Sequence, residues 1–209
     1  IDIKGAGNLA ISSTAGDISM TGSALNPTAT SGATGDLSIT SAGGLDLSET
    51  SVQLNKIYDG TTNFLALQAD GDIQLDGATI DIDHRSNATP YAQANIISQN
   101  GSINLGDADV TAVNSASNTS GVNLSLQAAT AILGDSNSFT TDGTVSLTTD
   151  TGDIRLTGLD LDNSVLTRSL TVDAAGELQL NGAILNRGSV TLSGSSATLD
   201  SLTVDVKGA

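Results

Sequence analysis

Apolar residues recur along the chain in short pairs one residue apart, with polar or small residues between them. The stretch from Phe64 to Asp83 shows this pattern most clearly, because its apolar positions form three such pairs. Alternation with a period of two places both members of a pair on one face of a β-strand. Gly71 and Gly77 separate the pairs and suit bends, since glycine adopts backbone angles that side chains obstruct. Three short strands are therefore predicted within about twenty residues, the size of one solenoid repeat. The pairs are Leu65 with Leu67, Ile73 with Leu75 and Ile80 with Ile82.

This stretch can be laid over the rest of the sequence about eight times, with copies roughly 20 to 30 residues apart. The first strand of each copy is predicted to carry Leu9/Ile11, Leu37/Ile39, Leu65/Leu67, Ile97, Leu124/Leu126, Val145/Leu147, Leu170/Val172 and Val190/Leu192. The second carries Ile18/Met20, Leu45/Leu47, Ile73/Leu75, Ile103/Leu105, Ile154/Leu156 and Leu178/Leu180, and the third carries Leu25, Ile80/Ile82, Val110, Leu159/Leu161 and Ile184/Leu185. Strands wound in the same sense give parallel sheets, and the crossover rule favours right-handed winding. The sequence therefore predicts an all-β fold, a right-handed parallel β-helix of about eight coils with loop insertions.

Coil length varies because extra residues enter between the third strand of one coil and the first strand of the next. Both prolines fall in these insertions, as expected if the strands need every backbone N–H for continuous ladders. The fifth coil has Gly134 where a core residue is expected, so an irregular coil is predicted there. Gln74, Asn104 and Gln179 occupy outward positions, where stacked amides are expected to hydrogen-bond along the rod. The predicted insertions are Asn26 to Thr34, Glu49 to Asn63, His84 to Ala94, Ala112 to Ser120 and Gly134 to Asp142.

The charge is strongly negative, with 23 acidic residues against 7 basic residues and a formal net charge of −16. This balance argues against nucleic acid and anionic membranes as partners, and no apolar run is long enough for membrane insertion. We expect the acids to keep a long rod soluble and to oppose sideways association. The absence of Cys excludes disulfides and thiolate chemistry. Because repeat-like sequence runs almost to both ends and Ile1 follows no initiator Met, residues 1–209 are expected to be a single β-helix segment of a longer repetitive chain.

Four short segments resemble repeats of the filamentous haemagglutinin family of large exoproteins. They read Gly-Asp-Ile-Ser-Met-Thr-Gly at 16–22, Gly-Asp-Ile-Gln-Leu-Asp-Gly at 71–77, Gly-Asp-Ile-Arg-Leu-Thr-Gly at 152–158 and Gly-Glu-Leu-Gln-Leu-Asn-Gly at 176–182. The segment 56–62, Lys-Ile-Tyr-Asp-Gly-Thr-Thr, is similar to a short motif common in such adhesins. The resemblance implies a right-handed β-helical shaft, exported from a Gram-negative bacterium by two-partner secretion or autotransport.

Two carboxylates on neighbouring coils are the feature that a catalytic β-helix would need. Asp153 and Glu177 each follow a turn glycine and are predicted to stack on adjacent coils, with Arg155 beside them. Carboxylates so placed can share a proton, hold a cation or flank a glycosidic bond. An acid after a turn glycine is also ordinary turn chemistry. We interpret these acids as structural and predict no catalytic residues.

Metal binding and histidine chemistry have few candidates. Asp81 and Asp83 lie on the outward face of one predicted strand, where Ca²⁺ is the one cofactor considered, although the glycine-rich nonapeptide calcium motif is missing. His84 is the only histidine, and we expect it to face solvent at the start of an insertion beside Arg85.

The insertions form the other candidate surface. If they leave the rod from one corner, their aromatic and basic side chains gather there, and aromatic faces can stack on sugar rings. Alternatively, the aromatic side chains fold back to cover a coil. The candidates for ligand contact are Lys56, Tyr58, His84, Arg85, Tyr91 and Phe139.

These features predict a structural shaft of a secreted bacterial cell-surface adhesin, with no enzymatic activity, that projects binding regions for cell adhesion or biofilm formation. Its expected partners are flanking repeats of the same chain and surface glycans or proteins of other cells. Two alternatives remain open: a β-helical polysaccharide-degrading enzyme, and a glycan-binding module that uses the insertions.

Overall fold

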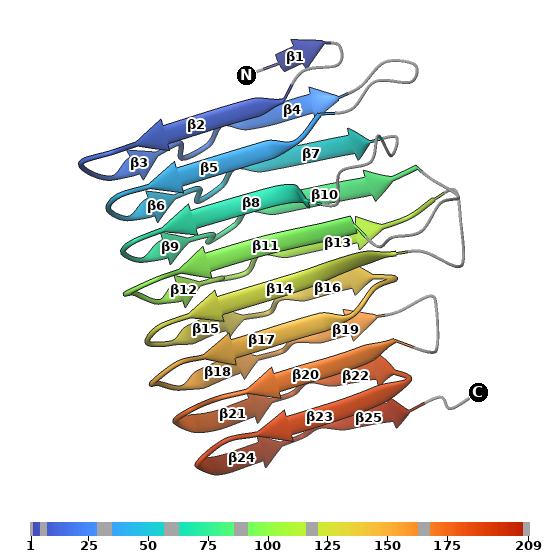
Figure 1. Cartoon of the computed structure of the whole chain (residues 1–209). Coiled ribbons are helices and arrows are strands. Elements are labelled where there is room, and N and C mark those ends of the chain that lie inside the picture. The colour runs from blue at the N-terminus through green and yellow to red at the C-terminus, as the bar shows by residue number, and fades with distance from the viewer. Residues whose placement is uncertain are drawn as a thin grey trace.

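A computed structural model of the chain has an all-β fold. It describes residues 2–4, 8–28, 35–56, 63–85, 92–115, 121–162 and 168–206. Within these ranges there are 25 strands and no helix, and no membrane-spanning helix is found there. Successive strands pass in turn through three parallel sheets, so that one strand from each sheet makes a coil (Figure 1). The predicted parallel β-helix of about eight coils is confirmed for the described residues.

The three sheets are named here by the order in which a coil enters them. The first sheet contains β2 (Leu9–Ser13), β5 (Leu37–Ser41), β8 (Asn63–Ala69), β11 (Ala92–Ser98), β14 (Val122–Ala128), β17 (Val145–Thr149), β20 (Ser169–Asp173) and β23 (Ser189–Ser193). The second sheet contains β3 (Ile18–Ser19), β6 (Leu45–Asp46), β9 (Ile73–Gln74), β12 (Ile103–Asn104), β15 (Ile132–Asp135), β18 (Ile154–Thr157), β21 (Glu177–Asn181) and β24 (Ser196–Asp200). The third sheet contains β1 (Asp2–Lys4), β4 (Ala24–Thr28), β7 (Ser51–Lys56), β10 (Thr79–His84), β13 (Asp109–Val113), β16 (Ser138–Thr141), β19 (Asp160–Asp162), β22 (Ile184–Arg187) and β25 (Thr203–Val206).

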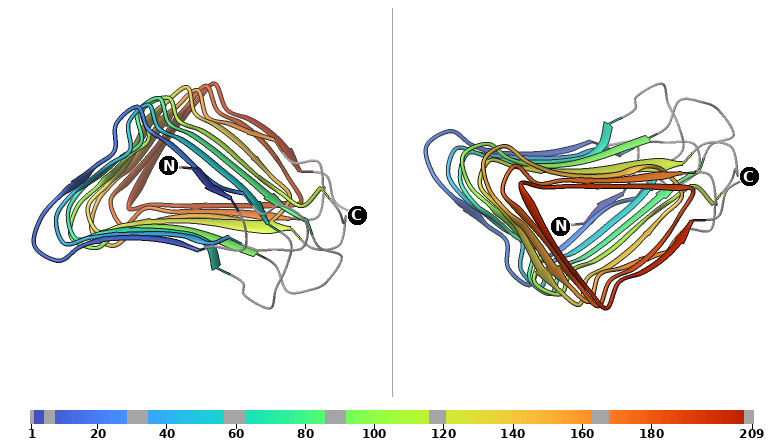
Figure 2. Two further views of the ribbon diagram at one scale, coloured as in Figure 1. Left: turned by 90° about the horizontal axis from the view of Figure 1, so that it is seen from above. Right: turned by 90° about the horizontal axis from the view of Figure 1, so that it is seen from below.

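Inward side chains stack in columns along the rod. Viewed along the axis, the coils superimpose and the three sheets form the sides of a triangle (Figure 2). In one column, Leu45, Ile73, Ile103 and Ile132 pair in register on successive coils, and each is at most 1% exposed. Full burial of such a side chain contributes about 1.5–3 kcal/mol. The repeated apolar pairs in the sequence are therefore the source of the core.

Burial in these columns depends on the neighbouring coils. Leu185 of β22 is 0% exposed, whereas Val204, its register partner in the last coil, is 42% exposed. Leu180 and its partner Leu199 show the same contrast, at 0% and 46%. Each coil is therefore stabilised mainly by the coils next to it, as in other solenoids.

The predicted inward positions are wrong at two places, one of which is Ile184, 41% exposed in β22. The other lies in β11. Ile96, not Ile97, points inward in β11, because Ile96 pairs with Leu67 and Leu126 of the neighbouring strands. Alternation alone does not choose between two adjacent isoleucines, whereas the pairing on both sides does. Ile97 consequently lies on the outer surface of the first sheet.

All five predicted insertions overlap strands, and the expectation that both prolines lie outside strands is wrong because Pro27 lies in β4. Two of the predicted insertions contain a whole strand. Glu49 to Asn63 contains the whole of β7, and Gly134 to Asp142 contains the whole of β16. Val52 and Leu54 alternate on the inner face of β7, which completes the third side of the second coil. These strands were missed because each carries a single short apolar pattern among polar residues.

The fifth coil keeps its ladder despite Gly134. This glycine pairs with Leu156 of the next coil and so occupies a core position, as predicted. A Cβ on Gly134 would collide with the buried side chain of Asn137, which fills the space. The Asn137 amide also donates to the Gly106 carbonyl at 2.8 Å, so the fifth coil is tied to the fourth. The prediction of an irregular coil is therefore only partly right.

Candidate functional site

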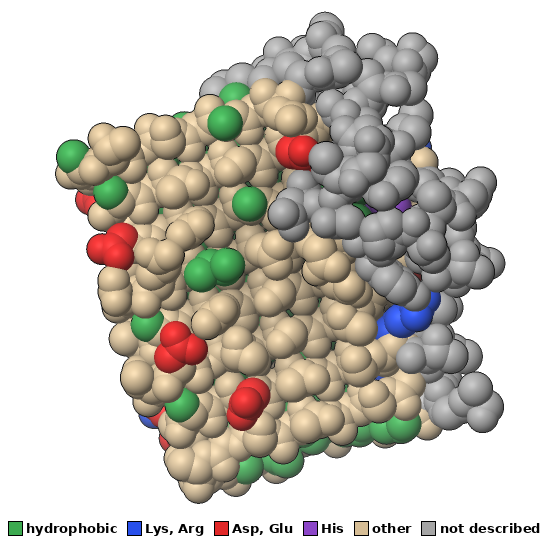
Figure 3. Space-filling view, in the orientation of Figure 1, with side chains coloured by type: hydrophobic (Ala, Val, Ile, Leu, Met, Phe, Trp, Pro, Cys, Tyr) green, Lys and Arg blue, Asp and Glu red, His purple; other side chains and the backbone are tan. Residues whose placement is uncertain are grey.

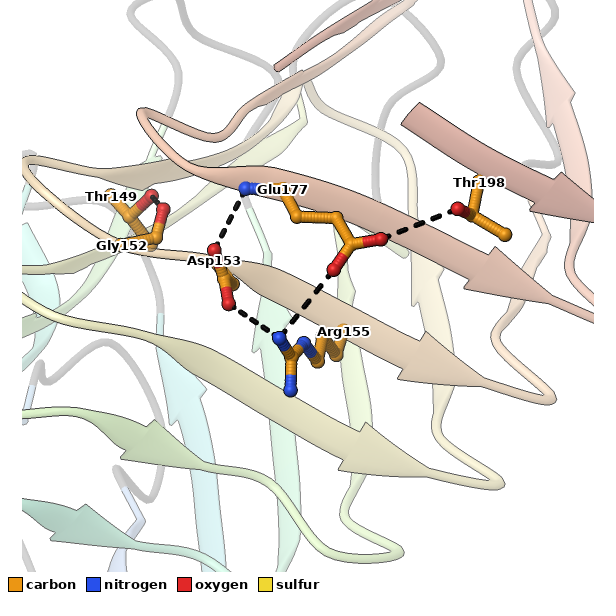
Figure 4. A network of polar contacts seen from close by, with 6 residues as sticks. All are labelled: Thr149, Gly152, Asp153, Arg155, Glu177 and Thr198. Carbon is orange, nitrogen blue, oxygen red and sulfur yellow. Dashed lines mark hydrogen bonds and ion pairs between the residues drawn. The ribbon is translucent and has the colours of Figure 1, made fainter. Parts of the chain in front are cut away.

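Asp153, Glu177 and Arg155 form a polar cluster on the outer face of the second sheet (Figure 4). The two carboxylates lie on adjacent coils, as predicted, and Nη2 of Arg155 is 2.7 Å from Asp153 Oδ2 and 3.5 Å from Glu177 Oε2. The Arg155 side chain is 50% exposed, so screening by water keeps each ion pair below about 1 kcal/mol. Glu177 Oε1 also accepts the Thr198 hydroxyl at 3.3 Å. The cluster thereby links β18, β21 and β24.

The acid that follows the turn glycine makes a bond to the backbone of the next coil. Asp153 Oδ1 accepts the Glu177 N–H at 2.7 Å. The same bond joins Asp17 to the Gly44 N–H at 2.7 Å and Asp72 to the Ser102 N–H at 2.8 Å. In each case the carboxylate of one coil accepts a hydrogen bond from a backbone N–H in the turn of the next coil, so the two turns are held together. This recurrence supports the structural interpretation of these acids.

The glycine of the following coil leaves room for that carboxylate. A Cβ on Gly101 would lie 2.5 Å from Asp72 Oδ1, and Gly43 and Gly176 face Asp17 and Asp153 in the same way. Their backbone φ is not positive, unlike that of Gly77, which has a φ of 65°. Gly71, at the same bend, also lacks a positive φ, so the expectation that it supplies a special bend angle is wrong. Gly43, Gly101 and Gly176 instead allow close approach between coils.

An open groove of about 430 Å³ crosses the second sheet over the first three coils. It is lined by Asp17, Asp46 and Asp72 together with neutral residues. The pKa of Asp46 is lowered, first because the backbone N–H of Ser48 donates to its carboxylate at 3.0 Å. Asp46 therefore stays ionised at neutral pH. Nowhere in the described ranges do three or more His, Cys, Asp or Glu side chains form a group that could hold a metal ion.

The amide ladder is confirmed at one step beside this groove. Asn104 Nδ2 donates to Gln74 Oε1 at 2.9 Å, across β12 and β9. At the corresponding position of later coils, Gln179 pairs in register with Arg155 rather than with another amide. The ladder is therefore local.

Asp83 and Arg85 form an ion pair at the corner where β10 ends. Arg85 Nε donates to Asp83 Oδ2 at 2.7 Å, and Ser115 donates to the same carboxylate through its N–H at 3.1 Å and its hydroxyl at 3.0 Å. Burial raises the pKa of Asp83, but the hydrogen bonds from Arg85 and Ser115 outweigh it, so the pKa is lowered overall. Asp81 lies two residues earlier on the outer face, beside Gln53 and Thr111. Calcium binding by this pair of aspartates stays a prediction.

His84 is buried, which contradicts the expectation that it faces solvent. It is 0% exposed, and its ring packs edge-on against Phe64 with 4.8 Å between centroids. Its Nδ1 lies 3.3 Å from the side-chain nitrogen of Asn114 in the next coil. Ile80, Ile82 and His84 alternate along β10, so the strand continues one residue further than predicted and turns His84 inward.

Phe139 is also in the core rather than on the surface. It is 0% exposed in β16, between its register partners Val110 and Leu161. Lys56 ends β7 opposite His84, whereas Tyr58 and Tyr91 lie outside the described residues. Of the six proposed ligand contacts, His84 and Phe139 are therefore not accessible, and Arg85 is exposed.

Two buried polar residues at the same corner were not anticipated. The Asp142 carboxylate accepts the N–H of Asn114 at 2.5 Å and that of Val122 at 2.9 Å, and so joins the two strand ends that flank an insertion. Burial raises the pKa of Asp142, although these hydrogen bonds oppose the rise. Arg187 is 0% exposed and donates from Nη1 to the Gly143 carbonyl at 2.9 Å. Arg187 lies two residues after the inward-facing Leu185, so strand alternation predicts that Arg187 also points inward.

No protein-family model, curated protein or solved structure matches the chain. The resemblance to filamentous haemagglutinin repeats therefore stays a prediction.

Proposed function

We propose that the chain is a structural shaft segment of a secreted bacterial cell-surface adhesin, similar to filamentous haemagglutinin, which projects binding regions away from the cell. The proposal is supported by the outward-facing acids, which form hydrogen bonds between coils. Asp17, Asp72 and Asp153 each bind the backbone of the neighbouring coil, and Asp153 belongs to the pair of acids that most resembles a catalytic pair. Side chains that connect coils favour a mechanical role over catalysis.

The dependence of burial on adjacent coils also suits an exported rod. A chain that leaves the cell unfolded can add coils one at a time, because each finished coil offers a backbone edge and an apolar surface to the next. The net charge of −16 keeps such a chain soluble during this process.

A replacement experiment in the full-length protein tests the shaft. Residues 1–209 are deleted, or exchanged for an unrelated parallel β-helix of equal length, and adhesion of intact cells is measured after antibody labelling has shown equal surface display. A shaft predicts weaker adhesion for the deletion and normal adhesion for the exchange. Loss of adhesion in both variants refutes the shaft and indicates that this segment itself contacts the ligand.

A second candidate function is polysaccharide cleavage, favoured by the groove that contains Asp17, Asp46 and Asp72 on adjacent coils. Such an enzyme needs one protonated carboxyl group as general acid, a role that Asp46 does not fit because its pKa is lowered. Purified chain is incubated with acidic and neutral polysaccharides, and reducing ends and unsaturated products are measured. Cleavage that is lost in Asp46→Asn supports this candidate, and no cleavage of any substrate contradicts it.

A further inference from the structure

The first sheet carries almost no charge. Within its eight strands only Asp173 is ionisable, and its carboxylate accepts the Ser193 hydroxyl at 2.5 Å. By contrast, the strands of the second sheet contain Asp46, Asp135, Glu177 and other charged residues. On a chain with a net charge of −16, the acids are thus concentrated on the other two sheets and at the turns.

The outer face of this sheet is broad and mostly neutral, with a few acidic side chains visible on it (Figure 3). Along one outward column, Ala66, Asn95, Ser125 and Ser146 follow one another in register. Ile97 lies on the same face between Gln68 and Gln127, partly exposed near the middle of the rod. The core does not need Ile97, because Ile96 fills the inward position of that coil.

We propose that this face is a lateral docking surface for a second copy of the chain, packed first sheet against first sheet. Two rods that each carry −16 repel one another, and repulsion is smallest where their acids are furthest from the contact. The first sheet is the side that meets this condition. A symmetric pairing also buries Ile97 of both copies within one shared interface.

The size of the face is sufficient for a specific but reversible dimer. Eight strands about 4.8 Å apart span roughly 38 Å, and five residues of about 3.3 Å each span roughly 17 Å. Pairing two such faces buries about 1,300 Å² in total, which is at the lower end of the range for specific complexes. This proposal goes beyond the shaft function and concerns only the purified chain, so either can fail without the other.

Sedimentation velocity of the purified chain over a concentration series tests the docking surface. Dimers are expected, and the dissociation constant should fall as salt rises, because salt screens the repulsion between the acidic rods. Ile97→Asp should raise the dissociation constant at least about tenfold, since it places two further carboxylates in the interface.

Leu133→Asp is the matched control, because Leu133 is also an outward apolar side chain of a central coil, 38% exposed, but belongs to the second sheet. Its dissociation constant should equal that of the unsubstituted chain, and circular dichroism should show both variants folded. A chain that is monomeric at every concentration and salt level overturns the proposal. It is also overturned if Ile97→Asp leaves dimers intact while Val206→Asp in the last coil abolishes them, because association is then end to end.

Discussion

Gly101→Ala probes the fit between the turn glycine of one coil and the aspartate of the coil before it. The added Cβ would lie 2.5 Å from Asp72 Oδ1, 2.6 Å from Asp72 N and 2.6 Å from the carbonyl carbon of Gly71. Carbon atoms pack best at about 3.5–4.0 Å, so both the carboxylate and the backbone of the third coil must move. The carboxylate can then no longer accept the Ser102 N–H at 2.8 Å.

The expected destabilisation has two parts. Forcing a methyl group against backbone atoms costs about 1–3 kcal/mol, and losing a side-chain cap on a backbone N–H costs about 1 kcal/mol. Together they lower the free energy of unfolding by about 2–4 kcal/mol. For a chain of this length, that corresponds to a fall in Tm of roughly 4–16 °C.

Gly71→Ala supplies the control at the same turn position one coil earlier. Gly71 lies over Gly44 rather than over an aspartate, and its Cβ would meet the nearest atom, Gly44 N, at 3.3 Å. A shift of a few tenths of an ångström relieves that contact, so the expected cost is below about 1 kcal/mol. Urea unfolding followed by circular dichroism compares the two variants. Equal destabilisation would show that the glycine serves the turn conformation, and the proposed fit with the carboxylate would be wrong.

Three further predictions concern the corner where the insertions begin. Phe139→Ala should lower the free energy of unfolding by about 3–5 kcal/mol, whereas Phe139→Leu should cost less than about 1.5 kcal/mol, since Phe139 is fully buried between aliphatic residues; urea midpoints distinguish a core role from a surface role. Asp142 has a raised pKa in the folded state, so its contribution to stability is present below its unfolded pKa of 3.8 and is lost as pH rises through the folded value. The stability of the unsubstituted chain relative to Asp142→Asn should therefore fall between pH 3 and pH 7, and a rise would show that the hydrogen bonds to the carboxylate outweigh burial. Asp83 has a lowered pKa, so its contribution is present above 3.8 and is lost as pH falls through the folded value; Arg85→Ala should raise that pKa in an NMR titration, and an unchanged pKa would show that Arg85 does not hold the carboxylate.

The parallel sheets were predictable because period-two pairs are a local signal. Ile73 with Leu75 or Ile154 with Leu156 identifies an inward face without reference to any other coil. The signal fails where a strand lacks a clear pair or has two candidates, as at Ile97. There the register is decided by the strands on either side, which the sequence of one coil does not contain.

The buried polar residues at the ends of the third-sheet strands were not predicted, for a related reason. Alternation counted only through aliphatic side chains ends at Ile82 and leaves His84 in an insertion, although His84 continues the alternation of β10 inward. A buried polar side chain is acceptable there because Asn114 of the next coil lies beside its ring nitrogen. Polar residues at the ends of strands in a solenoid should therefore be tested against the same position in adjacent coils before they are assigned to loops.

The role of each turn glycine likewise depends on the residue beside it in the preceding coil. Within a single coil, Gly101 and Gly71 look alike, yet an aspartate lies beneath the first and a glycine beneath the second. The distinguishing information is one coil away, where Asp17 precedes Gly43, Asp72 precedes Gly101 and Asp153 precedes Gly176 in the stack. An acid in one coil is thus followed, one coil length later, by a glycine. The reason is that the carboxylate needs a backbone N–H to bind and also needs the space that a side chain at the glycine position would fill. The acids that most resembled catalytic groups are therefore explained together with the glycines that make room for them.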